Sequence, residues 1–214
     1  MELVRRAPMV PTMTSAEFMH RDGRLPAIIG TFSGGCFHVL DPREDEVRFV
    51  DIAHHLSLIC RYTGATRELW SVAAHCLEVS HRVEQRAGTF AAQLQGLLHD
   101  ASEAYLVDIP RPFKPDVSIA GDSYYAVEER LMRVICRALG ISQDFDPLVK
   151  YVDDGMVDDE VANFFGPGFI WDRYSITEER TNLLALAKQS PLETAMRFID
   201  RYEELSYLVA RYGG

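Results

Sequence analysis

Apolar residues recur at spacings of three and four along most of the chain, which is the period of an amphipathic helix. The pattern predicts helices over about 50–60, 69–84, 90–105, 124–139, 146–164 and 191–211. Stretches that alternate with period two are few, and only Thr31 to Val39, with its two glycines, is typical of a short hairpin or an ordered loop. The sequence therefore predicts an all-α fold.

Breaks between these segments are also readable. Thr63 to Thr66 interrupts the pattern, Gly166 to Gly168 ends a helix, and Asp51 is a plausible N-cap for the first one. Three prolines between Pro110 and Pro115 exclude regular helix and predict a rigid loop. We expect an irregular N-terminal extension over residues 1–48, packed on one helical domain over 49–214, because 214 residues suffice for one sizeable domain.

The charge balance limits the kinds of partner that the protein is expected to bind. With 22 basic and 32 acidic residues the chain carries a formal net charge of −10, whereas a nucleic-acid face needs a basic stripe. We therefore expect no polymeric nucleic acid as partner. A small phosphorylated substrate stays compatible, since one metal ion and a few basic side chains suffice to hold it.

Cellular context is predicted from what the sequence omits. No run of eighteen apolar residues and no N-terminal leader pattern is present, so we expect no membrane segment. The four cysteines include no C-x-x-C pair, which speaks against a zinc knuckle or a redox motif. These features favour a cytoplasmic protein.

The pair His99-Asp100 directly follows a leucine-rich helical run. Burying an imidazole and a carboxylate near a core costs several kcal/mol, roughly, unless a metal or a partner compensates them. His75 and Asp153 lie on two other predicted helices, and Glu103 follows His99 by one helical turn. Two imidazoles and two carboxylates suit a divalent transition metal, so these residues predict a metal site.

Simpler interpretations compete with the metal site. A single histidine on an apolar helix, such as His75, is more often a hydrogen-bonded core residue than a ligand. Asp153 has three close competitors for the role of fourth ligand: Asp154, Asp158 and Asp159. Spacing alone leaves that choice open.

In their order and helical setting, His75, His99-Asp100 and Asp153 resemble the HD-domain metal-dependent phosphohydrolases. The run His99 to Glu103, followed by Asp108 to Lys114, is similar to the H-D-A-S-E…D-[LI]-P-x-P-x-K signature of the family's bacterial 5′-deoxynucleotidases. It is also similar to phage dATP triphosphohydrolases, and the segment before His75 resembles the phage type more. The resemblance covers about residues 30–165.

The resemblance implies a ligand set of His75, His99, Asp100 and Asp153, with Asp154 as the alternative to Asp153. In the family the last ligand precedes a helical glutamate by two turns, as Asp153 precedes Glu160. One departure is the acidic run from Asp153 to Glu160, where relatives are more often apolar or small.

The resemblance also implies roles for residues around the metal. Glu103 and Asp108 together would activate water and protonate the leaving oxygen. Four further residues would bind substrate: Arg61 and Lys114 the phosphates, Tyr62 the sugar in place of the usual tryptophan, and Pro112 the base. Without the resemblance, Arg61 is better explained as a solvated helix-end cation.

The function implied is hydrolysis of a deoxynucleoside triphosphate, dATP foremost, to deoxyadenosine and triphosphate. The alternative is a 5′-deoxynucleotidase acting on dNMPs, and a weaker one is a non-catalytic nucleotide-binding regulatory protein. Hydrolysis of an alarmone or a cyclic dinucleotide is disfavoured, because the longer catalytic insert of such enzymes is missing. Zn, Co or Mn are the expected metals, with Mg on the substrate phosphates. A homo-oligomer, dimer or hexamer, is expected in the cytoplasm, of the host if the gene is phage-borne.

Overall fold

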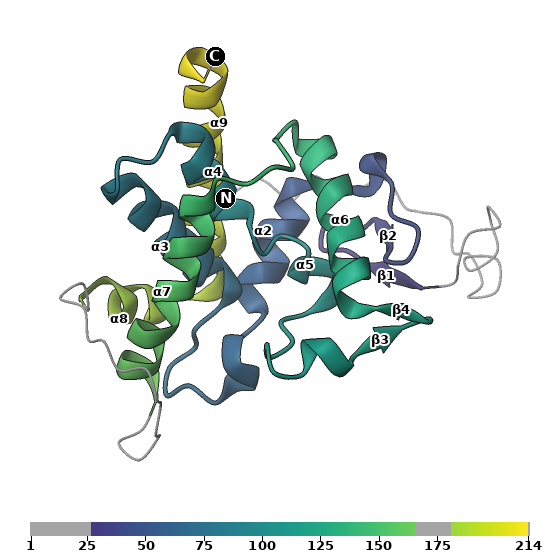
Figure 1. Ribbon diagram of the computed structural model, residues 1–214, viewed down its shortest axis with the longest axis horizontal. Helices are drawn as coiled ribbons and strands as arrows, with labels where there is room; N and C mark the ends of the chain where they lie inside the picture. The colour runs from purple at the N-terminus through teal and green to yellow at the C-terminus, as the bar shows by residue number, and fades with distance from the viewer. Residues whose placement is uncertain (1–26, 166–180, 214) are drawn as a thin grey trace, which may run out of the picture.

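Helices dominate the computed structural model, which describes residues 27–165 and 181–213 (Figure 1). The helices are α2 (Phe49–Leu58), α3 (Val72–Gln85), α4 (Phe90–Leu98), α5 (Glu103–Leu106), α6 (Tyr124–Leu139), α7 (Pro147–Phe164), α8 (Thr181–Ala187) and α9 (Pro191–Tyr212). Short 3-10 turns lie at Glu44–Glu46, Arg61–Gly64 and Lys114–Asp116. Strands β1 (Ile28–Gly30) and β2 (Cys36–His38) pair antiparallel, as do β3 (Ser118–Ile119) and β4 (Asp122–Ser123). The predicted all-α class is confirmed.

Side-chain caps fix where the long helices begin. Ser71, Ser123 and Ser190 each accept a hydrogen bond from a backbone amide in the first turn of α3, α6 and α9. Glu193 completes a capping box with Ser190, and Asp146 caps α7. These caps satisfy amides that have no partner inside the helix, so the boundaries follow from local sequence.

Helix α3 lies at the centre of the packing, and nearly all of it is buried. Ala73 and Leu77 belong to a hydrophobic cluster formed with α2, α4, α6 and α9. Ala74 and Val79 belong to a second cluster, formed with α4, α7 and α8, that includes Trp70. His75 therefore projects from a helix that both hydrophobic clusters hold in place.

Gly96 lets α4 lie close against α3. A β-carbon added there would meet the Ser80 Cα at 3.3 Å and its backbone nitrogen at 3.4 Å, which is tighter than ordinary packing. The absent side chain thus brings the end of α4, where His99 follows, to the level of His75 on α3.

The N-terminal hairpin was predicted as a hairpin or an ordered loop, and it forms β1 and β2 with Gly30 opposite Cys36. Its turn is tied to α2, because the Ser33 amide and hydroxyl donate to the Asp51 carboxylate. Asp51 therefore does not cap α2 as predicted; it is buried in the first turn, and Arg48 stands at the N-cap. Phe37 stacks on Tyr105. Residues 1–26 lie outside the described part, so the role of the extension stays a prediction.

One predicted helix is divided. In the segment expected as a single helix over 90–105, α4 ends at Leu98 and α5 begins at Glu103. Between them the amides of Ala101 and Glu103 donate to the carbonyls of Leu98 and Asp100, three residues back, which tightens the chain. His99 and Glu103 therefore do not lie one turn apart on a continuous helix, as predicted, because the helix is interrupted between them.

Smaller differences concern the ends. The first helix stops at Leu58 rather than near residue 60, and α8 and β3–β4 had no readable pattern. Gly166–Gly168 falls outside the described residues. Among the described helices, none combines the length and the apolarity needed to span a bilayer.

Candidate metal centre

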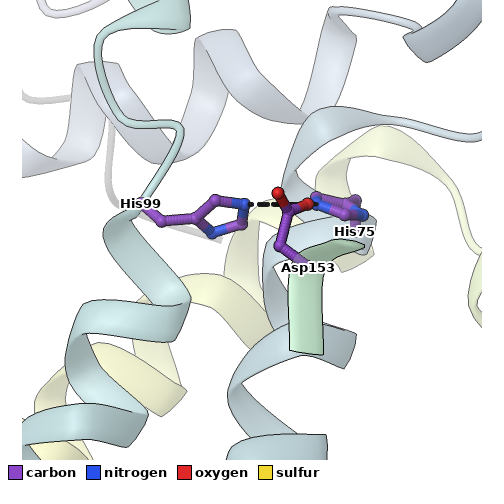
Figure 2. A group of neighbouring side chains, drawn as sticks. All are labelled: His75, His99 and Asp153. Carbon is purple, nitrogen blue, oxygen red and sulfur yellow. Dashed lines mark hydrogen bonds and ion pairs between the residues drawn. The ribbon is translucent and has the colours of Figure 1, made fainter. Parts of the chain in front are cut away.

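Two imidazoles face each other between α3 and the end of α4 (Figure 2). The His99 Nδ1 lies 2.8 Å from the Gly96 carbonyl, and the His75 Nδ1 lies 2.6 Å from Glu160 Oε1. Because both partners are acceptors, each Nδ1 carries the hydrogen, and each Nε2 presents its lone pair. The two Nε2 atoms are 3.2 Å apart.

Two carboxylates complete the cluster. Asp153 Oδ1, from α7, lies 3.1 Å from His75 Nε2 and 3.7 Å from His99 Nε2. Asp100 Oδ2 lies 3.2 Å from His99 Nε2 and 3.8 Å from His75 Nε2. Four electron-pair donors thus converge with no hydrogen-bond donor among them in the neutral-histidine state.

Such a cluster fits a divalent metal. Metal–nitrogen bonds of about 2.0–2.1 Å place neighbouring ligand atoms roughly 2.9–3.4 Å apart, close to the shorter separations here. The pKa shifts of the site residues also favour a positive charge at this position. Burial lowers the pKa of His99, but Asp100, Cys76 and Asp153 together outweigh burial and raise it well above the ordinary value. The histidines in turn outweigh burial at Asp153 and lower the pKa of that carboxyl. The site requires a positive charge, as a proton or as a cation.

The structure distinguishes Asp153 from its competitor. His75, His99 and Asp153 each bring a donor atom within 4.8 Å of the others. Asp154 belongs to no such group, and its carboxylate binds Lys150 at 2.9 Å and Arg111 at 3.0 Å. Position 153 therefore faces the histidines and position 154 faces outward.

A second group of donors, Cys76, His99 and Asp100, also lies within 4.8 Å. Burial raises the pKa of the Cys76 thiol, however, which keeps its proton in place. Because metal ligation uses the thiolate, the protonated Cys76 is a poor ligand. Asp100 and His99 of this group are then left to act together with His75 and Asp153.

Glu160 forms a hydrogen bond with the Nδ1 side of the His75 ring. It is fully buried and accepts hydrogen bonds from His75, from Arg61 at 3.2 and 3.3 Å, and from the Tyr62 hydroxyl. Arg61 and His75 outweigh burial and lower the pKa of Glu160 to about 2, so it is ionised. A carboxylate on Nδ1–H is the usual partner that orients a metal-binding histidine.

Arg61 and Tyr62 lie beside this carboxylate. Arg61 also approaches Asp100 at 3.5 Å, so its guanidinium lies between the carboxylates of Asp100 and Glu160. Tyr62 and Thr63 both adopt left-handed backbone angles, with φ of 55° and 53°. Strain of this kind, about 1–3 kcal/mol per residue, is common around functional sites. The predicted phosphate and sugar residues are thus adjacent to the metal cluster.

Glu103 and Asp108 lie in the same pocket lining as the candidate ligands Asp100 and Asp153. Glu103 is buried; Oε1 lies 3.5 Å from Lys114 Nζ, and Oε2 has no hydrogen-bond partner among the described residues. Burial, followed by the charges of Asp100 and Asp108, raises the pKa of Glu103 well above its ordinary value. Burial also raises the pKa of Asp108. Both carboxyls are therefore able to hold a proton.

A cavity of about 980 Å³ opens over these groups. All six predicted catalytic and substrate-binding residues line it, together with Asp100 and Asp153. The remaining lining residues are Thr63, Ala65, Ile109, Pro110, Arg111, Lys150, Asp154, Val157, Asp158 and Phe165. A volume at the upper end of the usual ligand-pocket range accommodates a nucleotide.

Comparison with known proteins identifies a relative. The uncharacterized protein YfdR of Escherichia coli is 34% identical over 188 residues, which cover 85% of this chain and 97% of YfdR. This chain belongs to the YfdR family. An uncharacterized protein of Rhodobacter capsulatus is 32% identical over 114 residues, covering 51% of this chain and 56% of that protein. No family model matches the chain.

The YfdR-family chain also carries site residues that the sequence did not single out. Arg111 and Lys150 line the cavity, although neither was predicted to contact substrate. In the sequence, Arg111 is a basic residue inside the proline-rich loop, and Lys150 is a basic residue three positions before Asp153. Sequence alone does not distinguish such residues from solvated surface charges. The contacts of Glu160 with Arg61 and Tyr62 likewise join segments almost a hundred residues apart.

Proposed function

We propose that this protein is a metal-dependent phosphohydrolase that removes the whole triphosphate from a deoxynucleoside triphosphate, dATP foremost. The observation that carries the proposal is the pair of Nε2 lone pairs 3.2 Å apart, with two carboxylates against them. With neutral histidines these four atoms are all acceptors, an arrangement that a bound cation satisfies. The large cavity over this cluster and the extra carboxyls beside it support catalysis rather than a structural ion.

His75, His99, Asp100 and Asp153 would hold the metal. When bound there, a divalent ion would supply Lewis-acid polarisation of a phosphoryl oxygen and lower the pKa of nearby water. Glu160 keeps the His75 ring in the tautomer that leaves Nε2 free for the ion.

Glu103 and Asp108 jointly supply the proton transfers. One carboxylate accepts a proton as water oxygen bonds to the α-phosphorus, and the bond from that phosphorus to O5′ breaks. The O5′ oxygen takes a proton from a carboxyl group, so deoxyadenosine and triphosphate leave. The raised pKa values of both groups suit this exchange near neutral pH.

Substrate contacts follow from the cavity lining. Arg61 and Lys114 are placed to bind phosphate oxygens, while the Tyr62 ring and Pro112 offer apolar surface for the sugar and the base. The triphosphate form of the proposal is supported by the cavity volume and by the four basic residues in the lining: Arg61, Arg111, Lys114 and Lys150.

The test is a product assay. Purified protein with Zn²⁺, Co²⁺ or Mn²⁺ is incubated separately with dATP and dAMP, and the products are separated by anion-exchange chromatography. Deoxyadenosine and tripolyphosphate from dATP are expected, with loss of turnover in excess chelator. Hydrolysis of dAMP alone would establish a 5′-deoxynucleotidase instead. Metal binding without turnover of any nucleotide would point to a regulatory protein.

A further inference from the structure

A charged cluster outside the metal site lies in the lining of the same cavity. It consists of Arg111, Lys150 and Asp154, and we call it the mouth cluster. Asp154 accepts from Arg111 at 3.0 Å and from Lys150 at 2.9 and 3.0 Å. Arg111 also reaches Asp153 Oδ2 at 3.4 Å, so the cluster borders the metal ligands directly.

The mouth cluster joins two separate elements. Arg111 belongs to the proline-rich loop after α5, whereas Lys150 and Asp154 lie one turn apart on α7. The loop is stiffened by its prolines, and α7 carries Asp153 on its inner side. Two cations from different elements therefore meet at Asp154, beside the candidate ligand Asp153.

These ion pairs are weak enough to exchange. The side chains of Arg111, Lys150 and Asp154 are 64%, 74% and 44% exposed. Exposed pairs contribute at most about 1 kcal/mol, whereas a guanidinium binds a phosphate with two parallel charge-assisted hydrogen bonds. An anion that offers more charge than one carboxylate can take the place of Asp154.

The inner cations Arg61 and Lys114, which would bind the phosphate nearest the metal, have carboxylate partners that are less exposed than Asp154. Arg61 is bound to Glu160 and near Asp100, and Lys114 donates to Glu128 at 2.9 Å and Glu103 at 3.5 Å. Among the described residues, Arg111 and Lys150 are the lining cations that pair with the exposed carboxylate of Asp154, and Arg111 also reaches Asp153 at 3.4 Å. They are the ones that an entering ligand can recruit at low cost.

We propose that Arg111 and Lys150 form the subsite for the distal phosphates of the substrate, with Asp154 as an internal anion that holds the two cations until those phosphates displace it. A single phosphate at the metal leaves nothing to replace Asp154, whereas a triphosphate brings two further phosphates to the two cations. This inference rests on the proposed function and says which residues would select a triphosphate over a single phosphate.

The experiment measures inhibition by inorganic tripolyphosphate and by orthophosphate, with bis(p-nitrophenyl) phosphate as a chromogenic substrate. The full chain is used with Mn²⁺ in excess over both anions, so that tripolyphosphate does not withdraw the metal. Calorimetric titration with each anion gives a readout that does not depend on turnover. The variants are Arg111→Gln, Lys150→Gln and Asp154→Asn, with Arg133→Gln, an exposed arginine on α6 paired with Glu129, as the charge-matched control.

The measured quantity is the ratio of the two inhibition constants within each protein. Arg111→Gln is expected to weaken tripolyphosphate about tenfold or more relative to orthophosphate, as for loss of a charged hydrogen bond. Lys150→Gln should act in the same direction, and Asp154→Asn should tighten tripolyphosphate severalfold. Arg133→Gln should leave the ratio as in the unmodified protein.

Two results would overturn the subsite. If Arg111→Gln weakens both anions equally, Arg111 merely orients Asp153. If Asp154→Asn does not tighten tripolyphosphate, the role of Asp154 as an internal anion is wrong. Absence of chromogenic hydrolysis and of anion binding by the unmodified protein would instead contradict the proposed function itself, which keeps the two failures apart.

Discussion

The floor and the mouth of the cavity contain similar residue types in opposite settings. We define the floor as the lining residues Arg61, Tyr62 and Glu103 together with the buried Glu160 and His75, which hydrogen bonds connect to Arg61 and Tyr62. The floor carboxylates are 0–3% exposed. At the mouth, the carboxylate of Asp154 is 44% exposed and its two cations more so. Breaking a buried pair costs about 3–5 kcal/mol, against about 0–1 kcal/mol for an exposed one. The floor is thus held in one arrangement, and the mouth is free to change its partners.

The largest expected effect follows from replacing a floor ligand. His75→Ala should abolish stoichiometric metal binding and lower hydrolysis by more than the roughly 10–100-fold typical of outer-shell changes. Metal content by elemental analysis and turnover by chromatography measure both. His81→Ala, a half-buried histidine on the same helix, is the matched control and should keep its metal. Equal metal loss in both variants would show that only α3 had been disturbed.

How far the sequence predicted this floor depends on the residue. Helical periodicity places His75 on a helix and the candidate ligands His99-Asp100 and Asp153 at a helix end or on another helix. Spacing alone left Asp153 open against its acidic neighbours, and the resemblance to the HD-domain family made that choice. The break after Leu98 was missed because Ala101 and Ala104 continue the apolar spacing across it. The mouth was missed because Arg111 and Asp154 meet only when a loop folds against α7, and no periodicity encodes that contact.

Glu103→Gln should separate activity from stability at the floor. Removing the acid-base group should lower turnover by about 10²–10⁴-fold. The same change should stabilise chelator-treated protein above about pH 4.3, the ordinary pKa of a glutamate. The folded-state pKa is raised, so the native state binds more protons than the unfolded state and wild-type stability falls as pH rises between the two values.

The stability difference should therefore grow with pH by at most about 1.4 kcal/mol per pH unit across that window. Urea unfolding of both proteins at several pH values measures it. Glu128→Gln is the control, because it removes the other carboxylate bound to Lys114 without touching the buried one. A constant difference across the pH range contradicts the assignment of a raised pKa.

Glu160→Gln tests whether the floor acts through the orientation of His75. The amide presents N–H groups toward donors on Arg61 or Tyr62, and it leaves the Arg61 charge without its closest counter-ion. We expect about a 10–100-fold weaker metal affinity and a loss of roughly 3 kcal/mol in unfolding free energy. Competition with a metal-sensitive dye and denaturant titration measure these. Glu129→Gln, exposed on α6, should change neither.

Val107→Gly probes the turn that carries the chain from Glu103 to Asp108. Val107 has φ of 73°, which a β-branched residue rarely adopts, and its carbonyl accepts from the Tyr124 hydroxyl at 3.1 Å. Relief of about 1–2 kcal/mol of strain, offset by about 0.5–1 kcal/mol of glycine chain entropy, should leave a small gain in stability. Turnover should fall severalfold as Asp108 loosens. Val107→Ala, which keeps a β-carbon, should show less of both effects in the same assays.

The smallest effect belongs to the mouth. Lys150→Gln should change the unfolding free energy by less than about 0.5 kcal/mol, because an exposed pair one helical turn apart contributes little and its Lys-to-Asp order is the weaker one. Asp154 keeps Arg111 in any case. Denaturant titration of this variant beside Glu160→Gln places both regions on one scale. A loss above about 1 kcal/mol at Lys150 would mean that the mouth supports the fold, and exchange of its partners for phosphate would then no longer be cheap.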